Sequence, residues 1–211
     1  MAFITFEGIE GCGKTTQLHR LADRLGPLAL TTREPGGTSI GRAVRQVLLD
    51  PANRAMAAET ELLLYFADRA QNLAEVIRPA LAQGRVVLCD RHVESSLAYQ
   101  GYGRGVPLVA IRQLAALATG GLRPDTIVLI DVPVEVGLSR VGRRGAQDRL
   151  EREVVAFHER VRAGFAALLA EEPSRWLRLD GTAHEDVVFA TLVRGLAERG
   201  VIEAGPAERR P

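Results

Sequence analysis

The segment Gly8–Thr16, which reads GIEGCGKTT, constrains the fold of this chain more than any other segment. It matches the pattern G-x-x-x-x-G-K-[ST], in which successive backbone N–H groups surround the phosphates of a nucleotide. The lysine of this pattern reaches the β- and γ-phosphates, and the next hydroxyl group binds Mg²⁺. Such a loop follows a strand and opens a helix, so the segment predicts a local fold together with a nucleotide site.

Lys14 lies inside this loop and is the only lysine of the 211-residue chain, which otherwise uses arginine for its permanently charged basic side chains. A bias against lysine explains the arginines, but it does not explain why a lysine stands here. A compact ammonium group fits beside the phosphates of a bound nucleotide, whereas a broad, planar guanidinium group does not. We therefore expect a nucleoside triphosphate site with Mg²⁺ as its cofactor.

Alternating strand and helix patterns surround the loop. Short apolar runs predict five strands, at Ala2–Glu7, Pro27–Thr32, Arg85–Asp90, Thr126–Asp131 and Trp176–Asp180. Helical spacing of apolar residues predicts helices over 16–25, 40–49, 57–83, 106–118, 134–141, 148–170 and 185–199. This alternation predicts an α/β fold with right-handed crossovers. Together with the loop it indicates a P-loop NTPase-type three-layer sandwich, in which helices flank a five-stranded parallel sheet.

Composition limits the partners and the location that we expect. The formal net charge is +1, which gives no reason to expect binding to nucleic acid. No run of about 18 apolar residues predicts a membrane span, and the N-terminus enters a strand without a basic leader. Two cysteines without metal-binding spacing suggest a reducing cytoplasm. We expect one domain over residues 1–202, with a mobile lid at about 140–152 and a disordered tail at 203–211.

Several arginines occur where a plain solvated surface would not need them: Arg33, Arg69, Arg91 and a cluster of Arg140, Arg143, Arg144, Arg149 and Arg152. A single arginine of this kind could form a surface salt bridge of little energetic worth. Together they fit a protein that handles two phosphorylated substrates, because arginine binds phosphate oxygens in a bidentate fork. Gly142 and Gly145 interrupt the cluster, as expected for a mobile lid that closes on a transferred phosphoryl group. The loop has no basic residue at its variable positions 9–12, so we expect the lid to supply positive charge.

No convincing pair of histidine and aspartate suggests a general base. This fits an acceptor that is itself a phosphate monoester, because its second pKa is about 6 and it is largely ionised at neutral pH. Such an acceptor needs clamping and charge neutralisation more than it needs a base. A hydroxyl acceptor, in contrast, would need one.

These motifs together resemble those of the bacterial thymidylate kinase family. The motifs that carry the resemblance are Phe-Glu-Gly-x-Glu-Gly-x-Gly-Lys-Thr-Thr at 6–16, Arg-Glu-Pro-Gly-Gly-Thr at 33–38, the segment 65–69, Asp-Arg-His-x-x-Ser-x-x-Ala-Tyr-Gln-Gly at 90–101, Arg-Pro-Asp at 123–125 and Arg-Gly-x-x-Asp-Arg-x-Glu at 144–151. The resemblance extends from Phe3 to about Leu196. It implies transfer of the γ-phosphoryl group of MgATP to dTMP, giving dTDP and ADP for dTTP biosynthesis. It also implies a homodimer that forms through long helices, with residues 57–83 as a candidate.

The resemblance further implies which residues bind each substrate. For ATP they are Gly8, Ile9, Glu10, Gly11, Cys12, Gly13, Lys14, Thr15, Thr16 and Arg140, with the segment around 180–182 completing the adenine pocket and with Mg²⁺ at Thr15 and Asp90. For dTMP they are Glu10, Arg33, Pro35, Arg45, Tyr65, Arg69, Arg91, Ser96, Tyr99 and Gln100. The residues implied in catalysis are Lys14, Arg91, Arg144, Arg149 and Glu10, as in the relatives whose catalytic arginine comes from the lid. An aromatic residue stacks on thymine in the family, and Tyr65 and Phe66 are both candidates here.

Other functions are open at this point. A kinase for another nucleoside monophosphate would share the arginine clamp. A deoxynucleoside kinase would need a base, for which Glu34 is the candidate, and a non-catalytic module would bind ATP without turnover. A GTPase switch is excluded, because its Asn-Lys-x-Asp motif needs a second lysine. A cis peptide bond is rare before proline, but the tight Pro-Gly-Gly turn after Glu34 favours it. We therefore give the cis and trans forms of the bond between Glu34 and Pro35 equal weight.

Overall fold

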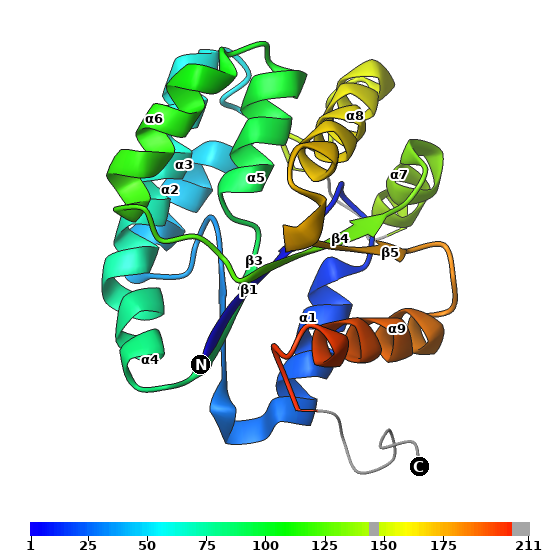
Figure 1. Cartoon of the computed structure of the whole chain (residues 1–211). Helices are drawn as coiled ribbons and strands as arrows, with labels where there is room; N and C mark the ends of the chain where they lie inside the picture. Colours follow the sequence, from blue (N-terminus) through cyan, green and yellow to red (C-terminus); the bar gives the residue numbers. More distant parts are fainter. Residues whose placement is uncertain (144–147, 204–211) are drawn as a thin grey trace.

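The computed structural model describes residues 1–143 and 148–203. Its centre is one sheet of five strands, all parallel, in the order β2-β3-β1-β4-β5 (Figure 1). The strands are β1 (Ala2–Glu7), β2 (Ala29–Arg33), β3 (Val86–Asp90), β4 (Thr126–Asp131) and β5 (Trp176–Asp180). The predicted bounds of β1, β4 and β5 are confirmed, and those of β2 and β3 differ by at most two residues at either end.

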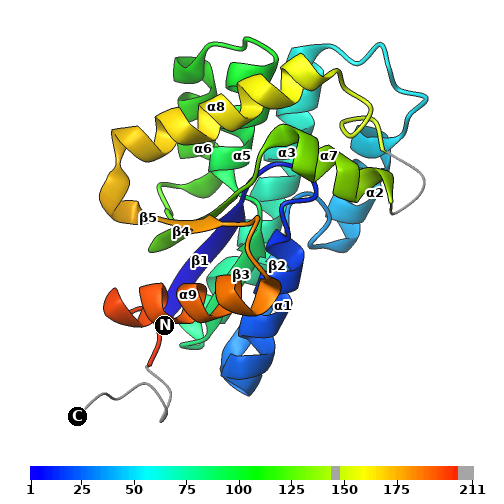
Figure 2. The ribbon, with the colours of Figure 1, turned by 90° about the vertical axis from the view of Figure 1, so that its right-hand side faces the viewer.

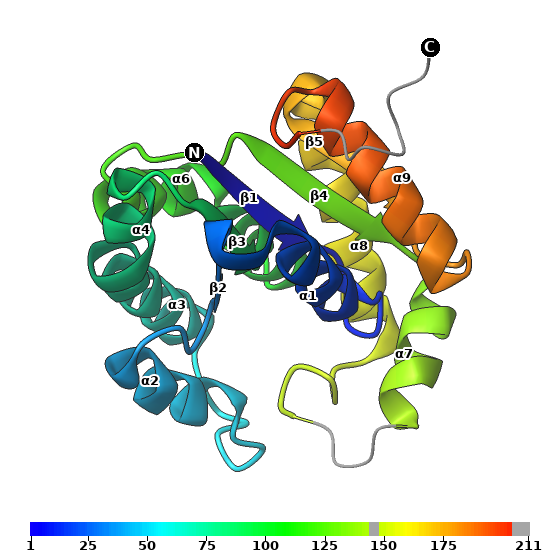
Figure 3. The ribbon, with the colours of Figure 1, turned by 90° about the horizontal axis from the view of Figure 1, so that it is seen from below.

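Helices cover both faces of the sheet, as the alternating pattern predicts. On one face α1 (Lys14–Leu25) and α9 (Glu185–Glu198) lie side by side (Figure 3). On the other face lie α5 (Val93–Ser96), α6 (Leu108–Thr119) and α8 (Val155–Glu171), together with the π-helical segment η3 (Leu97–Gly103) (Figure 2). The remaining segments are α2 (Ser39–Leu49), α3 (Ala58–Asn72), α4 (Arg78–Ala82), α7 (Val134–Gly142), η1 (Gly26–Leu28), η2 (Leu73–Ile77) and η4 (Pro173–Arg175). The predicted three-layer α/β sandwich is thereby confirmed.

β1 is buried along its whole length, because helices cover both of its faces. Its side chains alternate between the two faces, as in any strand. Phe3 packs with Leu73 and Ile77 of η2, whereas Ile4 and Phe6 belong to the larger core cluster. The strand therefore fixes the start of the following loop in the middle of the molecule.

The predicted helix over 57–83 is confirmed as one unbroken helical run over 58–82, made of α3, the π-helical η2 and α4. Another predicted helix differs from the structure. The predicted helix over 148–170 begins only at Val155. The side chain of Asp148 accepts hydrogen bonds from the backbone N–H groups of Leu150 and Glu151, both at 2.9 Å. Such bonds between a side chain and the nearby backbone favour a turn over a helix, so this stretch stays outside α8.

The sequence patterns predict no helix over 93–103, yet the structure forms α5 and η3 there. Gly101 and Gly103 interrupt the apolar periodicity of this segment, and glycine has a low helix propensity. The segment packs closely on α8, since a Cβ atom at Gly103 would come within 2.7 Å of the Phe157 ring. Tertiary packing therefore stabilises a segment that its own pattern does not predict.

Three smaller observations complete the comparison with the sequence. The peptide bond between Glu34 and Pro35 is cis. In the described part of the chain, no helix has the length and hydropathy that crossing a membrane requires. Residues 144–147 of the predicted lid and residues 204–211 of the predicted tail lie outside the described residues.

Candidate active site

The loop between β1 and α1 lies at the carboxyl edge of the sheet, where ligands of α/β proteins gather. Gly13 is the N-cap of α1 and has a φ of 96°, a conformation that favours glycine. At Gly11, a Cβ atom would come within 2.2 Å of the Gly137 carbonyl oxygen, so only glycine lets the loop pass this close to α7. The first backbone N–H groups of α1 are available to a ligand at this point, and the helix dipole favours an anion.

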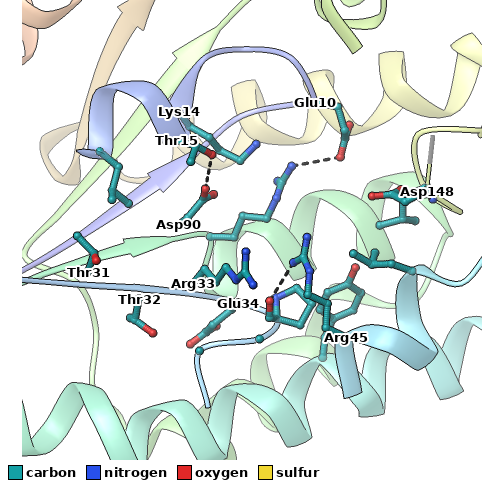
Figure 4. A pocket seen from close by; sticks show the side chains of 18 of the residues that line it. Glu10, Lys14, Thr15, Thr31, Thr32, Arg33, Glu34, Arg45, Asp90 and Asp148 are labelled. Carbon is teal, nitrogen blue, oxygen red and sulfur yellow. Dashed lines mark hydrogen bonds and ion pairs between the residues drawn. The ribbon is translucent and has the colours of Figure 1, made fainter. Parts of the chain in front are cut away.

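Thr15 and Asp90 meet where β1 and β3 end. The parallel register places Phe6 beside Asp90, and the Thr15 hydroxyl donates a hydrogen bond to Asp90 Oδ2 at 2.6 Å (Figure 4). Both side chains line the same cavity as Lys14. Hydroxyl and carboxylate oxygens are the ligands that Mg²⁺ prefers, so this pair fits the expected metal position. Within the described residues, no group of three or more His, Cys, Asp or Glu side chains forms a metal site on its own.

Two cavities meet at the phosphate loop. The first, of about 440 Å³, extends toward the turn after β2 (Figure 4). Six of the residues predicted to bind dTMP line it: Glu10, Arg33, Pro35, Arg45, Tyr65 and Arg91. The second, of about 730 Å³, extends from the loop toward residues 181–185. Gly11, Lys14 and Thr15 line both cavities. The loop is therefore a shared wall, and Lys14 stands where the two spaces meet.

Arg91 makes several polar contacts at the wall of the first cavity. It has a φ of 74°, which is unusual for a residue other than glycine and is found at sites that the surrounding structure holds in place. Its guanidinium group donates hydrogen bonds to the Gly8 carbonyl at 3.0 Å, to Glu10 Oε1 at 3.1 Å and to the Tyr99 hydroxyl at 3.0 Å. These contacts fix a positive charge at the cavity.

Glu10 is ionised although it is buried. Its Oε1 accepts a hydrogen bond from the Tyr99 hydroxyl at 2.6 Å, and its Oε2 lies 3.3 Å from Nδ1 of His158 in α8. Burial raises the pKa of Glu10, but the contact with His158 and the charges of Arg91 and Lys14 lower it to about 2. No local pattern marks His158 in the sequence, because only the packing of α8 brings it to the loop.

Arg69 is a fully buried arginine, with 1% of its surface exposed. Its Nε donates to Glu34 Oε2 at 2.6 Å, and its two terminal nitrogens donate to the Ser96 hydroxyl at 3.0 Å and to the His92 carbonyl at 2.8 Å. Burial raises the pKa of Glu34, but His92 and Arg69 lower it to about 2. The buried charge of Arg69 is therefore balanced by an ionised carboxylate.

A small inner cavity adjoins the first one and is lined by the remaining predicted residues of this side: Arg69, Ser96, Tyr99 and Gln100. Tyr65 lines both of these cavities. The neighbouring Phe66 packs in the core, where its ring centre lies 4.6 Å from the guanidinium carbon of Arg69. Of the two candidates for stacking on the base, Tyr65 lines these cavities and Phe66 does not.

Arg140 of α7 lies beside the phosphate loop in the second cavity. One of its nitrogens donates hydrogen bonds to the Gly181 carbonyl at 3.0 Å and to the Gly11 carbonyl at 3.3 Å. The predicted loop residues that line this cavity with it are Gly11, Cys12, Gly13, Lys14, Thr15 and Thr16. Ile9 is instead buried in the core, so only its backbone could take part in binding.

The structure does not bring Arg149 to the phosphate loop. Its side chain is buried, its Nε donates to the Leu48 carbonyl at 2.8 Å, and a terminal nitrogen lies 2.6 Å from Glu61 Oε2. Arg144, the other predicted lid arginine, lies outside the described residues. Asp148, which the sequence analysis does not single out, lines the first cavity. Its place next to Arg149 in a family motif is the signal that could have indicated it.

Comparisons with known proteins agree with one another. The family model for thymidylate kinase matches residues 6–191 of this chain. The thymidylate kinase of Deinococcus radiodurans is 53% identical over 201 residues, which cover 94% of this chain and 97% of that protein. The thymidylate kinase of Geobacter sulfurreducens is 53% identical over 188 residues, which cover 85% and 88%. The crystal structure of thymidylate kinase from Ehrlichia chaffeensis superposes with a TM-score of 0.75 at 34% identity, covering 92% of this chain and 98% of that chain.

Proposed function

Because this chain belongs to the thymidylate kinase family, and is a phosphotransferase of that family, we propose that it transfers the γ-phosphoryl group of MgATP to dTMP, giving dTDP and ADP. The observation that carries this proposal is the position of Lys14 between two cavities. The second cavity follows the glycine-rich loop and suits a nucleoside triphosphate. The first cavity is rich in arginine and suits a second phosphorylated ligand. Ligands in both would bring a donor and an acceptor phosphate together at Lys14.

ATP would bind in the second cavity. The backbone N–H groups of the loop and Lys14 would hold its phosphates, while Arg140 and the segment 180–182 would border the adenine. Mg²⁺ would be held by Thr15 and Asp90, which are already in contact. When bound, Mg²⁺ neutralises the charge that develops on the phosphate oxygens.

The phosphate and sugar of dTMP would bind in the first cavity. Arg91 would hold the phosphate by its positive charge, because its terminal N–H groups already donate to Gly8, Glu10, Ser95 and Tyr99. Arg33 and Arg45 add positive charge to the same cavity. Tyr99 is held in place by its hydrogen bonds with Arg91 and Glu10. We place its ring beside the deoxyribose, where it would leave little room for a 2′-hydroxyl group.

The base of dTMP would bind in the inner cavity. Tyr65 would stack on the thymine ring, because it lines both this cavity and the one that holds the phosphate. Arg69, Ser96 and Gln100 offer polar groups to the edge of the base. Both the charged wall and the polar inner end thus have a partner on the same nucleotide.

The state of Glu34 supports a phosphate acceptor over a hydroxyl acceptor. A deoxynucleoside kinase would use a general base, and Glu34 is the candidate for it. Its pKa of about 2, reached because His92 and Arg69 outweigh the effect of burial, makes it a very weak base near neutral pH. A phosphate acceptor that is already ionised does not need one.

We propose that the lid adds to the positive charge at the transferred phosphoryl group. Arg144 and Arg149 are the candidates, but Glu61 balances the charge of Arg149 in this structure. Arg149 would have to leave that partner to reach the loop. If the lid arginines act in the transition state, Arg144→Ala and Arg149→Ala will lower kcat far more than the affinity for dTMP. Wild-type kcat in both variants would remove the lid from the mechanism.

We also propose that the protein forms a homodimer through α3 and α6 in the cytoplasm. The two helices are neighbours and expose Leu63 (55%), Val109 (64%) and Leu117 (81%). Exposed apolar side chains on neighbouring helices favour association. Both cysteines are unpaired, in keeping with a reducing compartment. Light scattering coupled to gel filtration tests the dimer, and a particle of one 22.9 kDa chain at all concentrations would contradict it.

The proposed function is tested by measuring ADP release from MgATP with a panel of acceptors: dTMP, dUMP, UMP, dCMP, AMP and thymidine. We expect the highest kcat/KM with dTMP and no turnover with thymidine. Preference for thymidine would move the protein to the deoxynucleoside kinases. ATP binding without turnover of any acceptor would identify a binding module instead.

A further inference from the structure

Glu61 is a buried carboxylate that stands behind the inner cavity. It lies in the first turn of α3 with 1% of its surface exposed. Its Oε1 accepts a hydrogen bond from Gln100 Nε2 at 2.8 Å. Its Oε2 accepts a hydrogen bond from a terminal nitrogen of Arg104 at 3.1 Å and lies 2.6 Å from a terminal nitrogen of Arg149, and Arg104 Nε also donates to Oε1 at 3.4 Å. Gln100 lines the inner cavity and Glu61 does not, so any effect of Glu61 on a ligand there passes through its neighbours.

Glu61 can only accept hydrogen bonds in this position. Burial raises its pKa, but the hydrogen bond from Gln100 and the charge of Arg104 outweigh burial and lower the pKa below its ordinary value. The position near the N-terminus of α3 also favours the ionised form. An ionised carboxylate has no hydrogen to donate, so its partners must all present N–H or O–H groups.

The acceptor character of Glu61 fixes the orientation of the Gln100 amide. The amide nitrogen donates one of its two hydrogens to Glu61, so the carbonyl oxygen is the acceptor that Gln100 can offer the cavity. A flipped amide would bring its carbonyl oxygen against the carboxylate, with no hydrogen between two acceptors. Such a contact sets two buried acceptors against each other and loses the hydrogen bond from Gln100, which is costly.

Arg69 supplies the opposite hydrogen-bonding character at the same cavity. Glu34 holds its Nε, and a guanidinium group can only donate. The polar side of the cavity thus combines a donor with an acceptor, each fixed by a buried carboxylate. Thymine presents the matching pair, a carbonyl oxygen at C4 beside an N–H at N3. Cytosine presents the reverse, an amino group beside an acceptor nitrogen.

We propose that Glu61 is a positioning residue that sets base specificity by locking the amide of Gln100. Through this contact the cavity accepts a pyrimidine with a carbonyl group beside a ring N–H and rejects cytosine. The inference rests on the proposed function, because it takes the inner cavity as the site of the base. It assigns the choice between bases to a side chain that does not touch the nucleotide.

The direct test is Glu61→Gln, with kcat/KM measured for dTMP and for dCMP. A glutamine at this position can present either an N–H or a carbonyl group to Gln100, so the Gln100 amide becomes free to flip. We expect kcat/KM for dCMP to rise. The specificity ratio, which is kcat/KM for dTMP divided by kcat/KM for dCMP, should fall by at least about 10-fold. Equal losses for both nucleotides, with the ratio unchanged, would overturn the inference.

Arg104→Gln is the matched control. It removes a charged partner of Glu61 but leaves the bond between Glu61 and Gln100 in place. We expect this variant to keep the wild-type ratio within about 2-fold, whatever its stability. A ratio that falls as far as in Glu61→Gln would show that any disturbance of the Glu61 contacts relaxes specificity, and the proposal would fail.

A double-mutant cycle shows whether Glu61 acts through Gln100. In a Gln100→Ala background there is no amide to lock, so Glu61→Gln should not change the ratio further. A further change in that background would contradict the inference. If the Glu61→Gln protein does not fold, the side-chain amide of Gln100 is followed in the wild type by NMR, assigned by its loss in Gln100→Ala. One conformer, protected from hydrogen exchange, supports the lock, and a flipping amide refutes it.

Failure of this inference differs from failure of the proposed function. A wild-type protein that prefers an acceptor other than dTMP would remove the premise. A wild-type protein that prefers dTMP, with a ratio that Glu61→Gln leaves unchanged, would remove only the role of Glu61.

Discussion

Glu7 offers the sharpest test of the electrostatics beneath the phosphate loop. It ends β1, is completely buried, and accepts hydrogen bonds from the backbone N–H of His92 at 2.7 Å and from the Ser95 hydroxyl. Burial and the nearby charge of Glu94 raise its pKa from 4.5 to about 8. We therefore predict that Glu7 is mostly protonated in the folded protein at neutral pH, and that Glu7→Gln mimics this form.

The size of the effect follows from the raised pKa. An acid that holds its proton more tightly when folded stabilises the protein fully below its unfolded pKa, and this stability is lost as pH rises through the folded pKa. For Glu7 the window runs from the ordinary 4.5 to about 8. The slope within it is about 1.4 kcal/mol per pH unit, so the Glu7 contribution falls by about 2 kcal/mol between roughly pH 6 and pH 8.

The assay is urea unfolding of wild type and Glu7→Gln at a series of pH values. Glutamine does not titrate, so the difference between the two free energies of unfolding isolates Glu7 from other groups. We expect the wild type to lose about 2 kcal/mol relative to Glu7→Gln across this range. A difference that stays constant from about pH 6 to pH 8 would refute the reasoning, because Glu7 would then titrate alike in the folded and unfolded chain.

Three further predictions concern the site. Lys14→Arg should lower kcat by at least about 100-fold, because a planar guanidinium does not fit the phosphate loop; near-wild-type turnover, measured as ADP release with dTMP, would show that charge alone suffices. Tyr65→Ala should raise KM for dTMP by about 10-fold through lost stacking, whereas Phe66→Leu should lower the melting temperature and leave KM unchanged; the opposite pattern would reverse their assignment. Glu34→Gln should destabilise the protein by about 3–5 kcal/mol, because it leaves Arg69 charged and buried without its partner; a loss below about 1 kcal/mol in urea unfolding would argue against that pair.

The fold could be predicted well wherever a segment carries its own periodic pattern. The strands β1 and β4 are short apolar runs that are buried on both faces, and the edge strand β5 buries its apolar residues Trp176, Leu177 and Leu179, so the bounds of all three are visible in the sequence. The start of α8 was predicted too early, because hydrogen bonds from the Asp148 side chain turn the chain before Val155. The pattern does not predict a helix over 93–103, because its glycines serve close packing, Gly101 on α6 and Gly103 on α8, and weaken any helical pattern.

In the candidate site, too, the residues that belong to local motifs could be predicted, and their partners from distant segments could not. The loop residues and Arg91 are adjacent in motifs whose chemistry is plain from residue type and spacing. Their second partners come from distant segments: His158 reaches Glu10 from α8, and Glu61 reaches Gln100 from α3. No spacing rule connects such pairs, since their distance along the chain is unrelated to their distance in space.

The sequence by itself thus determined the phosphate loop, the parallel sheet and the family, because each depends on local pattern and on the order of elements. Only the tertiary structure decided that Tyr65 faces the cavity while Phe66 packs in the core. It also decided that Arg149 pairs with Glu61 in this arrangement, away from the phosphate loop. The physical reason is that burial and charge pairing depend on which segments meet. Which segments meet depends on packing across the whole core, so it cannot be predicted from any one segment.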